Sequence, residues 1–421
     1  MESVTLETAV KDIAQKARQA SRTMAALPTA VKNQILRDTA TALEANLEQI
    51  KAENSKDVAA AREKQLSPAM INRLEISEAV IADMIRGLHE IAALEDPVGE
   101  VDEMAKRPSG ITVGRMRVPL GVISMIYESR PNVTIDSAAL CLKAGNVVIL
   151  RGGSEAIHSN LVLAGIMQGV LSAAGVDPAV VQVLPFTDRA AVDILLKQEE
   201  YIDLVIPRGG EGLIRAVTQK SMIPVLKHYK GVCHIFIDKD AKPEMAIPIV
   251  HNSKVQRPGV CNAVEGVLVH QECSATMIPA LAADLSAAGV RLLGCAKSCS
   301  LDRRVEPAAD EDWGREFLDL ALVVKVVSGM DQAMEYIAEH GSQHTEAIIT
   351  DSYERSQRFL REVDASAVIV NAATRFNDGG QFGLGAEIGI STTKLHAYGP
   401  MGLKELTTRK FIVLGQGEIR S

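Results

Sequence analysis

The residue best suited to covalent chemistry is Cys261, in the segment 256–263 that precedes an apolar run at 264–269. Pro258 and Gly259 interrupt the helical pattern before it, so the backbone is expected to turn tightly there. In such a turn, main-chain amides can stabilise a thiolate and later an oxyanion. The alternative is structural, because cysteine is also a small hydrophobic residue that is commonly buried. Cys261 is therefore a candidate nucleophile that its surroundings must support.

A glycine-rich loop at 207–212 is a candidate for binding phosphate. It follows a short apolar run and opens a helical pattern. The amides of Gly209 and Gly210 would then lie at a helix N-terminus, where the absence of side chains lets a diphosphate approach closely. An ordinary strand-to-helix turn has the same composition, and the loop by itself does not decide between the two.

A second loop, 151–154, follows the apolar run that ends at Leu150. Loops at the carboxyl ends of parallel strands hold the ligands of open α/β sheets. An acidic residue there would bind a ribose 2′-hydroxyl and repel a 2′-phosphate. Arg151, beside Gly152, and Ser154 instead offer a positive charge and a hydroxyl. A dinucleotide in this loop is therefore expected to be NADP, although neither G-x-G-x-x-G nor G-x-x-x-x-G-K-[ST] occurs in the chain.

Two further features are weaker candidates for a site. His340 and His344 are spaced for one face of a helix, but Gly341 and Ser342 argue against a continuous helix, so no metal site is expected. The segment 376–387 is rich in glycine. Its backbone is therefore expected to approach another loop or a substrate closely.

Composition restricts the possible partners. Lys and Arg number 45 against 53 Asp and Glu, a net charge of −8, and aromatic residues make up 3%. Neither nucleic acid nor an anionic membrane surface is therefore an expected partner. The six cysteines show no C-x-x-C spacing, so a zinc ribbon or redox dithiol is not expected. The N-terminal segment carries charges where a signal peptide is apolar, and no uninterrupted apolar run reaches about 18 residues, so we expect a cytoplasmic protein.

Helical and α/β segments must position these residues. Residues 4–91 have apolar residues at every third or fourth position, as in helices, and 111–118 alternate as in a half-buried strand. From 121 onward, short apolar runs alternate with helical patterns, which indicates parallel sheets covered on both faces, with a boundary near 230. The expected strands are 121–127, 146–150, 181–184 and 204–206 before that boundary, and 234–237, 264–269, 321–326, 347–349 and 366–370 after it.

Several short motifs follow one another along nearly the whole chain. They are V-P-L-G-V-I at 118–123, Y-E-S-R-P-N-V-T at 127–134, L-R-G-G at 150–153, I-P-R-G-G at 206–210, Q-R-P at 256–258, C-N at 261–262, Q-F-G-L-G-A-E at 381–387, H-A at 396–397 and G-P-M-G-L at 399–403. In this order and spacing, the chain resembles the gamma-glutamyl phosphate reductase family of the aldehyde dehydrogenase superfamily. Each motif alone is weak, and it is their order that makes the resemblance specific.

The resemblance implies an aldehyde dehydrogenase-like α/β fold, with two parallel-sheet α/β domains and a small β oligomerisation element. Residues 1–106 and 121–229 would form the NADP-binding domain with the N-terminal helices. Residues 230–393 would form the catalytic domain, and 107–120 with 394–421 the oligomerisation element.

The resemblance also implies roles for particular residues. Cys261 is similar in position to the family's catalytic cysteine, and Gly209 and Gly210 to its phosphate-binding turn. Ser154 falls where NAD-preferring members of the superfamily carry Glu, which agrees with NADPH as the cofactor. Glu316 is similar in position to the glutamate that holds the nicotinamide ribose.

Three residues are candidates for binding the substrate. Arg257 adjoins the nucleophile and would stabilise its thiolate or an anionic substrate, although a solvated loop charge has the same sequence. Asn371 and Arg375 belong to a late loop of the expected catalytic domain, where the amino-acid head of a substrate would bind.

One departure from the superfamily bears on the reaction. Hydrolytic aldehyde dehydrogenases carry a water-activating Glu in an E-L-G-G-K stretch, whereas this chain has L-K-H-Y-K at 226–230. Poor water activation suits an enzyme that exchanges its acyl group with phosphate. The implied reaction is the NADPH-dependent reduction of L-glutamyl 5-phosphate to L-glutamate 5-semialdehyde and phosphate through a Cys261 thioester, the second step of proline biosynthesis from glutamate.

The resemblance further implies a homo-oligomer and a possible association with glutamate 5-kinase, which would supply the acyl phosphate. Two alternatives stay open. The first is a hydrolytic NAD(P)-dependent aldehyde dehydrogenase, which a test of phosphate dependence would distinguish from the reductase. The second is a non-catalytic NADP-binding protein that keeps the same fold.

Overall fold

The computed structural model describes residues 5–420 and divides into two compact units. Unit 1 runs to Lys227 and also includes Leu384–Gly389 and the chain from Met401. Unit 2 comprises His228–Gly383 and Ile390–Pro400. Unit 2 is therefore inserted into the sequence of unit 1. Residues 384–389, which the sequence analysis had assigned to the second domain, fall within unit 1.

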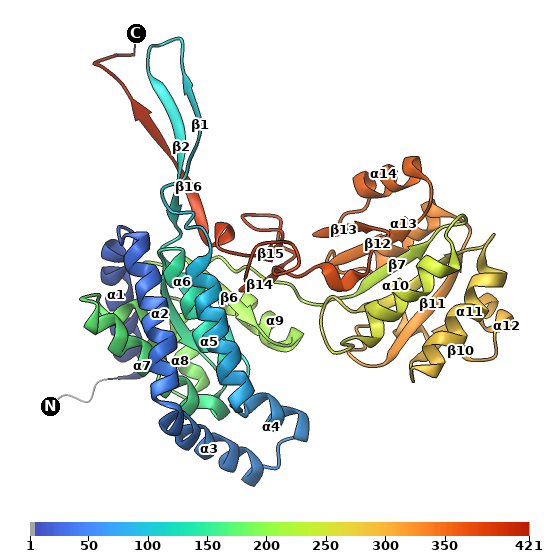
Figure 1. Ribbon diagram of the computed structural model, residues 1–421, viewed down its shortest axis with the longest axis horizontal. Helices are drawn as coiled ribbons and strands as arrows, with labels where there is room; N and C mark the ends of the chain where they lie inside the picture. The colour runs from blue at the N-terminus through green and yellow to red at the C-terminus, as the bar shows by residue number, and fades with distance from the viewer. Residues whose placement is uncertain (1–4, 421) are drawn as a thin grey trace. The chain divides into compact units, whose positions relative to one another are not determined.

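Five helices open unit 1, as the helical pattern of residues 4–91 predicted; residue 4 lies outside the described residues. Thr5, Ser67 and Ser77 cap three of them by accepting a hydrogen bond from a backbone N–H of the first turn. The helices are α1 (Leu6–Met24), α2 (Thr29–Ala45), α3 (Leu47–Glu63), α4 (Pro68–Leu74) and α5 (Glu78–Ala93) (Figure 1).

The main sheet of unit 1 is parallel, with the strand order β5-β4-β3-β6. The chain adds β4 and β5 on one side of β3 and then crosses back to place β6 on the other. The carboxyl ends of β3 and β6 therefore flank the topological switch point, where ligands of such sheets bind. The elements are β3 (Val122–Tyr127), α6 (Asn132–Lys143), β4 (Val147–Arg151), α7 (Ile157–Ala173), β5 (Val181–Val183), α8 (Arg189–Leu195), β6 (Leu204–Arg208) and α9 (Glu211–Lys220).

One helix of unit 1 corrects the sequence analysis. Among the described residues, Ser154–Ala173 is long and apolar enough to cross a membrane by length and composition alone, which the sequence analysis had excluded for every segment. The helix α7 packs on α2, α3 and β5, with Leu163, Met167 and Leu171 buried. The core helix of a folded domain meets the same criterion, and these contacts are those of a core helix.

Unit 2 is built on a seven-stranded parallel sheet in the order β10-β9-β11-β8-β7-β12-β13. Neighbouring residues of β7 point to opposite faces. Ile235 packs with Met277 of α11, and Phe236 packs with Phe359 of α14. Helices therefore cover both faces, as predicted. The elements are β7 (Cys233–Ile237), α10 (Pro243–Val255), β8 (Val264–His270), α11 (Ser274–Ala287), β9 (Arg291–Gly294), α12 (Ala296–Leu301), β10 (Val305–Pro307), β11 (Ala321–Val327), α13 (Met330–His340), β12 (Thr345–Ile349), α14 (Tyr353–Glu362) and β13 (Ala367–Val370).

A separate antiparallel sheet extends unit 1 (Figure 1). Its strands are β1 (Val101–Lys106), β2 (Thr112–Pro119) and β16 (Thr407–Leu414), with β2 in the centre. The strand predicted at 111–118 is confirmed as β2. On the edge strand β16, Phe411, Val413 and Leu414 are exposed. A further two-stranded sheet joins β14 (Gly389–Ser391) to β15 (Gly399–Met401).

Candidate active site

Cys261 lies in a tight turn between α10 and β8. The turn is closed by a hydrogen bond from the amide of Ala263 to the carbonyl of Val260, and the Cys261 side chain is half-buried. The thiol of Cys233, at the start of β7, donates to the carbonyl oxygen of Cys261 at 3.1 Å. The turn thus holds Cys261 at the amino ends of the central strands of the sheet.

Gly231 packs directly against the backbone of Cys261 and so helps to fix the position of this turn. A Cβ atom at Gly231 would lie 2.0 Å from the carbonyl oxygen of Cys261 and 2.5 Å from its Cα, so only glycine allows this approach. Glu316, predicted to hold the nicotinamide ribose, accepts a hydrogen bond from the amide of Gly231 at 2.8 Å. The structure therefore brings Glu316 to the main chain that packs on the nucleophile.

A buried ion pair spans the two ends of the nucleophile segment. Lys254, in the last turn of α10, lies 2.7 Å from the carboxylate of Glu265 in β8, and both side chains are at most 1% exposed. Burial raises the pKa of Glu265 to about 7 and lowers that of Lys254. Glu265 also accepts from the amide of Leu318. Because the pair joins the helix before Cys261 to the strand after it, it limits how far the loop can move.

Two histidines from distant parts of unit 2 converge on Cys261. The sulfur and one nitrogen from each of His228 and His344 lie within 4.8 Å of one another. The Nδ1 atom of His228 is 2.8 Å from the carbonyl oxygen of Ile390, which can only accept, so Nδ1 carries a proton. His344 is buried, and its burial and the nearby His228 lower its pKa to about 3. His344 lies immediately before β12, whereas His340 ends α13, so the two are not on one helix.

The sequence analysis missed these histidines as partners of Cys261. His344 had been considered only together with His340, and His228 only as part of the stretch that replaces E-L-G-G-K. The missing information is tertiary, since the starts of β7 and β12 become neighbours only through the strand order. Both strands are parallel, so the residues that precede them meet at one edge of the sheet.

Arg375 is held against the nucleophile segment. Its Nε donates to Gln256 at 2.8 Å, and its Nη1 donates to the side-chain oxygen of Asn262. Burial and then the positive charge of Arg257 lower the pKa of Arg375. Two of the predicted substrate residues, Arg257 and Arg375, thus lie close together and next to Cys261, where their charges favour an anionic ligand.

The third, Asn371, is not brought to Cys261. Its side chain pairs with Thr350, accepting from the amide and donating to the carbonyl, both at 2.9 Å. Asn371 follows β13 and Thr350 follows β12, so both lie at the carboxyl ends of strands. Cys261 lies at the amino ends, and a strand of five residues such as β7 spans about 16 Å. Asn371 therefore lies in the same unit as Cys261 but at the opposite edge of the sheet.

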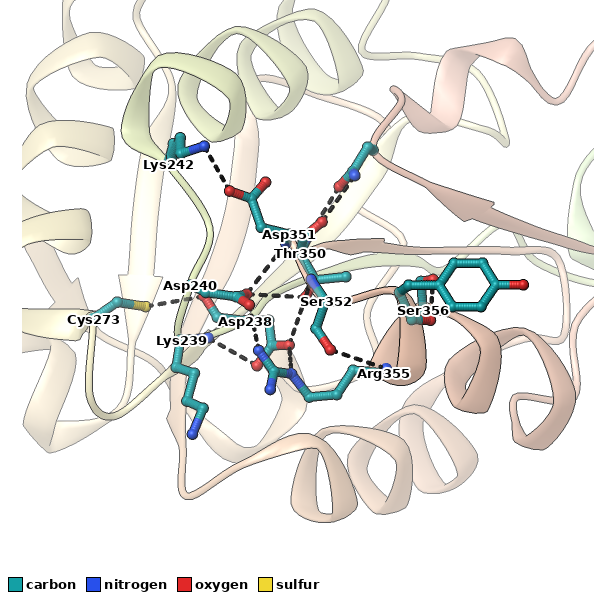
Figure 2. Close-up of polar contacts among 12 residues, drawn as sticks. Asp238, Lys239, Asp240, Lys242, Cys273, Thr350, Asp351, Ser352, Arg355 and Ser356 are labelled. Carbon is teal, nitrogen blue, oxygen red and sulfur yellow. Dashed lines mark hydrogen bonds and ion pairs between the residues drawn. The ribbon is translucent and has the colours of Figure 1, made fainter.

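That opposite edge is closed by ion pairs (Figure 2). Arg355 bonds to Asp238 and Asp240, which follow β7. Thr350 donates to the same two carboxylates, and Lys242 pairs with Asp351 at 2.7 Å. The carboxyl edge, where many α/β sheets bind ligands, is therefore occupied by the unit's own charged groups.

The loops predicted to bind a cofactor meet at the carboxyl edge of the unit 1 sheet. Gly209 and Gly210 follow β6 and precede α9. The carboxylate of Glu128, which follows β3, accepts from the amide of Gly210 at 2.8 Å, and a Cβ at Gly209 would lie 2.7 Å from it. A carboxylate thus already occupies the amide cradle at the helix N-terminus beside the switch point. The cradle accepts an anion, which fits a diphosphate.

Arg151, Gly152 and Ser154 lie at the neighbouring carboxyl end, that of β4. Arg151 donates to the carbonyl of Gly152 at 2.8 Å, and a Cβ at Gly152 would lie 2.2 Å from Asn160. Ser154 is exposed and donates to Glu155 at 3.3 Å. The expectation of NADP rested on the positive charge of Arg151 and did not include the carboxylate of Glu155.

Glu155 adds a negative charge to the loop. Its other oxygen accepts a hydrogen bond from Ser129, so the carboxylate is anchored between Ser129 and Ser154. Burial lowers the pKa of the Arg151 guanidinium, and the negative charge of Glu155 partly offsets this. The residue directly follows Ser154 in the sequence, so it could have been included in the charge argument for the 2′-phosphate.

The glycine-rich segment near residue 383 packs within unit 1 at two points. Gly385 has a positive φ of +78°, and a Cβ there would lie 2.2 Å from Leu94. Gly389, just beyond the segment 376–387, has a φ of +153°, and a Cβ there would lie 2.8 Å from Arg208. For these two positions, the close approach predicted from the glycines is to other parts of the same chain.

The family model and the fold define a class of enzyme. A family model described as the aldehyde dehydrogenase family matches residues 3–291. The solved structure of an acetylating aldehyde dehydrogenase from Geobacillus thermoglucosidasius has a TM-score of 0.68 at 16% identity, covering 99% of this chain and 98% of that one. The architecture is therefore the aldehyde dehydrogenase-like α/β fold expected from the sequence.

Relatives of higher identity are more specific. The gamma-glutamyl phosphate reductase of Desulfotalea psychrophila is 58% identical over 99% of this chain and 100% of its own length. That of Desulfatibacillum aliphaticivorans is 59% identical over 98% of this chain and 99% of its own. A crystal structure of the Thermotoga maritima reductase has a TM-score of 0.96 at 42% identity, covering 98% of this chain and all of that one. The chain therefore belongs to the aldehyde dehydrogenase family and, within it, to the family of gamma-glutamyl phosphate reductases.

This membership implies a nicotinamide cofactor and a small-molecule substrate. The solved structure of an engineered glycolyl-CoA reductase of the same fold has bound NADP+, at 14% identity to this chain. In unit 1 the amide of Gly210 already donates a hydrogen bond to one anionic group, the carboxylate of Glu128.

Proposed function

We propose that this chain reduces L-glutamyl 5-phosphate to L-glutamate 5-semialdehyde and phosphate with NADPH, in the second step of proline biosynthesis from glutamate. The observation that carries the proposal is its 54–59% identity to curated gamma-glutamyl phosphate reductases over at least 98% of the chain. The position of Cys261 in a fixed, half-buried turn between two arginines and two histidines supports it chemically.

Cys261 acts as the nucleophile in this proposal. Its sulfur bonds to the acyl carbon, the bond from that carbon to the phosphate oxygen breaks, and phosphate leaves with the electron pair. The bound nicotinamide supplies the hydride that reduces the resulting thioester. The carbon–sulfur bond then breaks, which releases the aldehyde and regenerates the thiolate of Cys261. Main-chain amides of the turn are suited to hold the oxyanion.

Arg257 and Arg375 bind the substrate in this scheme. Their proximity gives the nucleophile segment two positive charges, which favour a thiolate, an acyl phosphate and a leaving phosphate. Arg375 is oriented by Gln256 and Asn262, so its guanidinium is already ordered before the substrate binds. Asn371 is not assigned a substrate contact, because it pairs with Thr350 at the other edge of the sheet.

The cofactor is NADPH in this proposal. The carboxyl edge of the unit 1 sheet carries the groups that suit its phosphates, and Glu316, beside the nucleophile turn in unit 2, is assigned to the nicotinamide ribose. The residues assigned to the phosphates are Arg151, Gly152, Ser154, Gly209 and Gly210. Glu155 weakens the preference for a 2′-phosphate without abolishing it, because Arg151 remains the positive group of that loop.

Unit 1 serves as the cofactor domain and unit 2 as the catalytic domain in this proposal, with the β1-β2-β16 sheet as the oligomerisation element. The exposed apolar side chains of β16 are consistent with pairing between copies of the chain. We place the enzyme in the cytoplasm, where its free cysteines stay reduced. A transient association with glutamate 5-kinase would protect the labile acyl phosphate in transit.

The experiment that tests the function runs the reaction in reverse. Purified protein is incubated with NADP+ and glutamate 5-semialdehyde, with and without inorganic phosphate, and NADPH formation is followed by absorbance. We expect formation only with phosphate. Formation without phosphate would indicate a hydrolytic aldehyde dehydrogenase, and no formation under either condition would support a non-catalytic protein.

A pair of cysteine variants tests the nucleophile. Cys261→Ser should abolish turnover and leave NADPH binding intact. Cys273→Ser is the matched control, since Cys273 is another half-buried thiol of unit 2 and bonds only to the carbonyls of Asp238 and His270 among the described contacts. Substantial turnover by Cys261→Ser would remove this cysteine from the mechanism.

A further inference from the structure

We propose that Cys261, His228 and His344 form a binding site for a thiophilic divalent cation such as Zn²⁺, and that the bound cation reversibly blocks the nucleophile. One sulfur and two imidazole nitrogens, all within 4.8 Å of one another, are the ligand types that zinc prefers. Three protein ligands also leave the fourth tetrahedral position to water, as in other zinc sites with an open coordination position.

The hydrogen bonds around the histidines indicate which nitrogen of each ring carries the lone pair that a cation needs. The Nδ1–H of His228 donates to the carbonyl of Ile390 at 2.8 Å, so Nε2 carries the lone pair in the neutral ring. A backbone carbonyl that accepts from the far nitrogen is the usual second partner of a metal-binding histidine, because it fixes the tautomer and orients the ring. His228 therefore has the orientation of a ligand before any cation arrives.

His344 provides the independent observation. Its Nδ1 is 2.8 Å from the hydroxyl of Thr345 and 3.7 Å from the sulfur of Cys233. Cys233 donates its own proton to the carbonyl of Cys261, so it accepts from His344 and leaves the proton on Nδ1. The Nε2 of His344 is fully buried and has no hydrogen-bond partner among residues 5–420. A buried acceptor without a partner is costly, and a cation would satisfy it.

The geometry also explains why the cation would bind weakly enough to leave. An outer limit of 4.8 Å exceeds the ligand spacing of a closed zinc site, in which each ligand lies about 2.0–2.3 Å from the metal. Binding requires the Cys261 side chain to move toward the histidines and to release its thiol proton. The turn that carries Cys261 is held by Gly231 and by the Lys254–Glu265 pair, so the movement must come from the side chain.

A cation held in this way would occupy the sulfur lone pair that attacks the acyl carbon. Binding of the cation rests on the geometry alone, whereas inhibition rests on the proposed function of Cys261. The class of ligand is therefore a soft or borderline divalent cation, for which Zn²⁺ and Co²⁺ are suitable probes. Mg²⁺, which prefers oxygen ligands, should not compete.

The test measures binding by a signal that does not depend on turnover. Full-length protein is stripped with EDTA, dialysed and titrated with Co²⁺, and the thiolate-to-cobalt charge-transfer absorption in the near ultraviolet is followed. We expect a band that saturates at one Co²⁺ per chain and disappears when Zn²⁺ is added in equal amount. Cys261→Ser should lack the band, and His228→Gln should bind Co²⁺ about tenfold or more weakly.

The matched control is His340→Gln, because His340 belongs to the same unit but not to the cluster. Its Co²⁺ affinity should equal that of the unaltered protein. Inhibition is measured in parallel in the phosphate-dependent assay, where Zn²⁺ should block turnover, EDTA should restore it, and His340→Gln should keep the same sensitivity.

The proposal is overturned if no charge-transfer band forms, or if the band persists in Cys261→Ser, or if His228→Gln and His340→Gln bind Co²⁺ equally well. A chain that shows the band but has no phosphate-dependent activity would refute the proposed function and leave the cation site standing. Unchanged turnover in the presence of saturating Zn²⁺ would refute the block.

Discussion

Gly231→Ala offers a direct test of how the nucleophile is positioned. A Cβ at this position would lie 2.0 Å from the carbonyl oxygen of Cys261, whereas real Cβ contacts essentially never fall below 3.0 Å. The main chain must therefore separate by at least about 1 Å, and the contacted atoms are backbone, which cannot rotate away. Misplacing reacting groups by about 1 Å can lower a rate about 100-fold.

We therefore expect kcat/KM in the phosphate-dependent assay to fall by about 100-fold, which corresponds to roughly 2.7 kcal/mol of transition-state stabilisation. The rate of alkylation of Cys261, mapped by peptide mass spectrometry, should change as well, because the thiol moves relative to the side chains that surround it. Binding of NADPH, measured by quenching or calorimetry, should change much less, since the proposed phosphate-binding groups lie in unit 1.

Gly259→Ala is the matched control, because it introduces the same methyl group two residues from the nucleophile. Its Cβ would meet only the carbonyl oxygen of Leu318, at 3.5 Å, which is an ordinary contact. We expect its kcat/KM to stay within about threefold of the original. Nearly full activity in Gly231→Ala, or an equal loss in both variants, would refute the account of Gly231.

Three further predictions concern charged side chains described above. Lys254→Met leaves the Glu265 carboxylate buried without its partner, so the free energy of unfolding should fall by about 3 kcal/mol or more. Unfolding is followed by the fluorescence of Trp313, the chain's only tryptophan and a residue of unit 2. The double variant Lys254→Met with Glu265→Leu should recover most of the loss, and no recovery would contradict the explanation. Glu155→Gln removes a negative charge beside the guanidinium of Arg151, in the loop proposed to bind the 2′-phosphate. The KM for NADPH should therefore fall about fivefold and that for NADH much less, as expected for roughly 1 kcal/mol of charge interaction. An equal change for both cofactors would place the 2′-phosphate elsewhere. Arg375→Met should raise the KM for the acyl phosphate about tenfold or more without changing the affinity for NADPH, and an unchanged KM would remove this residue from the substrate site.

The sequence predicted the buried elements better than the exposed ones. Predominantly apolar runs identified β3, β8 and β11, because strands covered on both faces are rich in hydrophobic residues. The strands β1, β9 and β10 were not predicted. They are short, and β1 is largely exposed, so their residues carry little apolar pattern.

The candidate site shows the same division between local and tertiary information. Cys261 was identified as a candidate because the residues that form its turn are adjacent in the sequence. His228 and His344 were not found as its neighbours, because 116 residues separate them and only the pairing of β7 with β12 brings their ends together. That Asn371 and Cys261 lie at opposite edges could not be predicted for a related reason: one follows a strand and the other precedes one, and only the parallel sheet places those two ends apart.

The insertion of unit 2 into the sequence of unit 1 has a consequence for synthesis. The ribosome releases the chain from its N-terminus, so β2 emerges nearly 290 residues before β16, its partner in the register that joins Thr407 to Pro119. During that interval, one edge of β2 has no strand to pair with and is open to another nascent chain. Unit 2 up to Gly383 is complete in sequence before unit 1 receives its last strand. A ribosome that stalls between Gly383 and Thr407 would therefore carry a chain in which the turn of Cys261 is complete in sequence while one edge of β2 still lacks its partner strand.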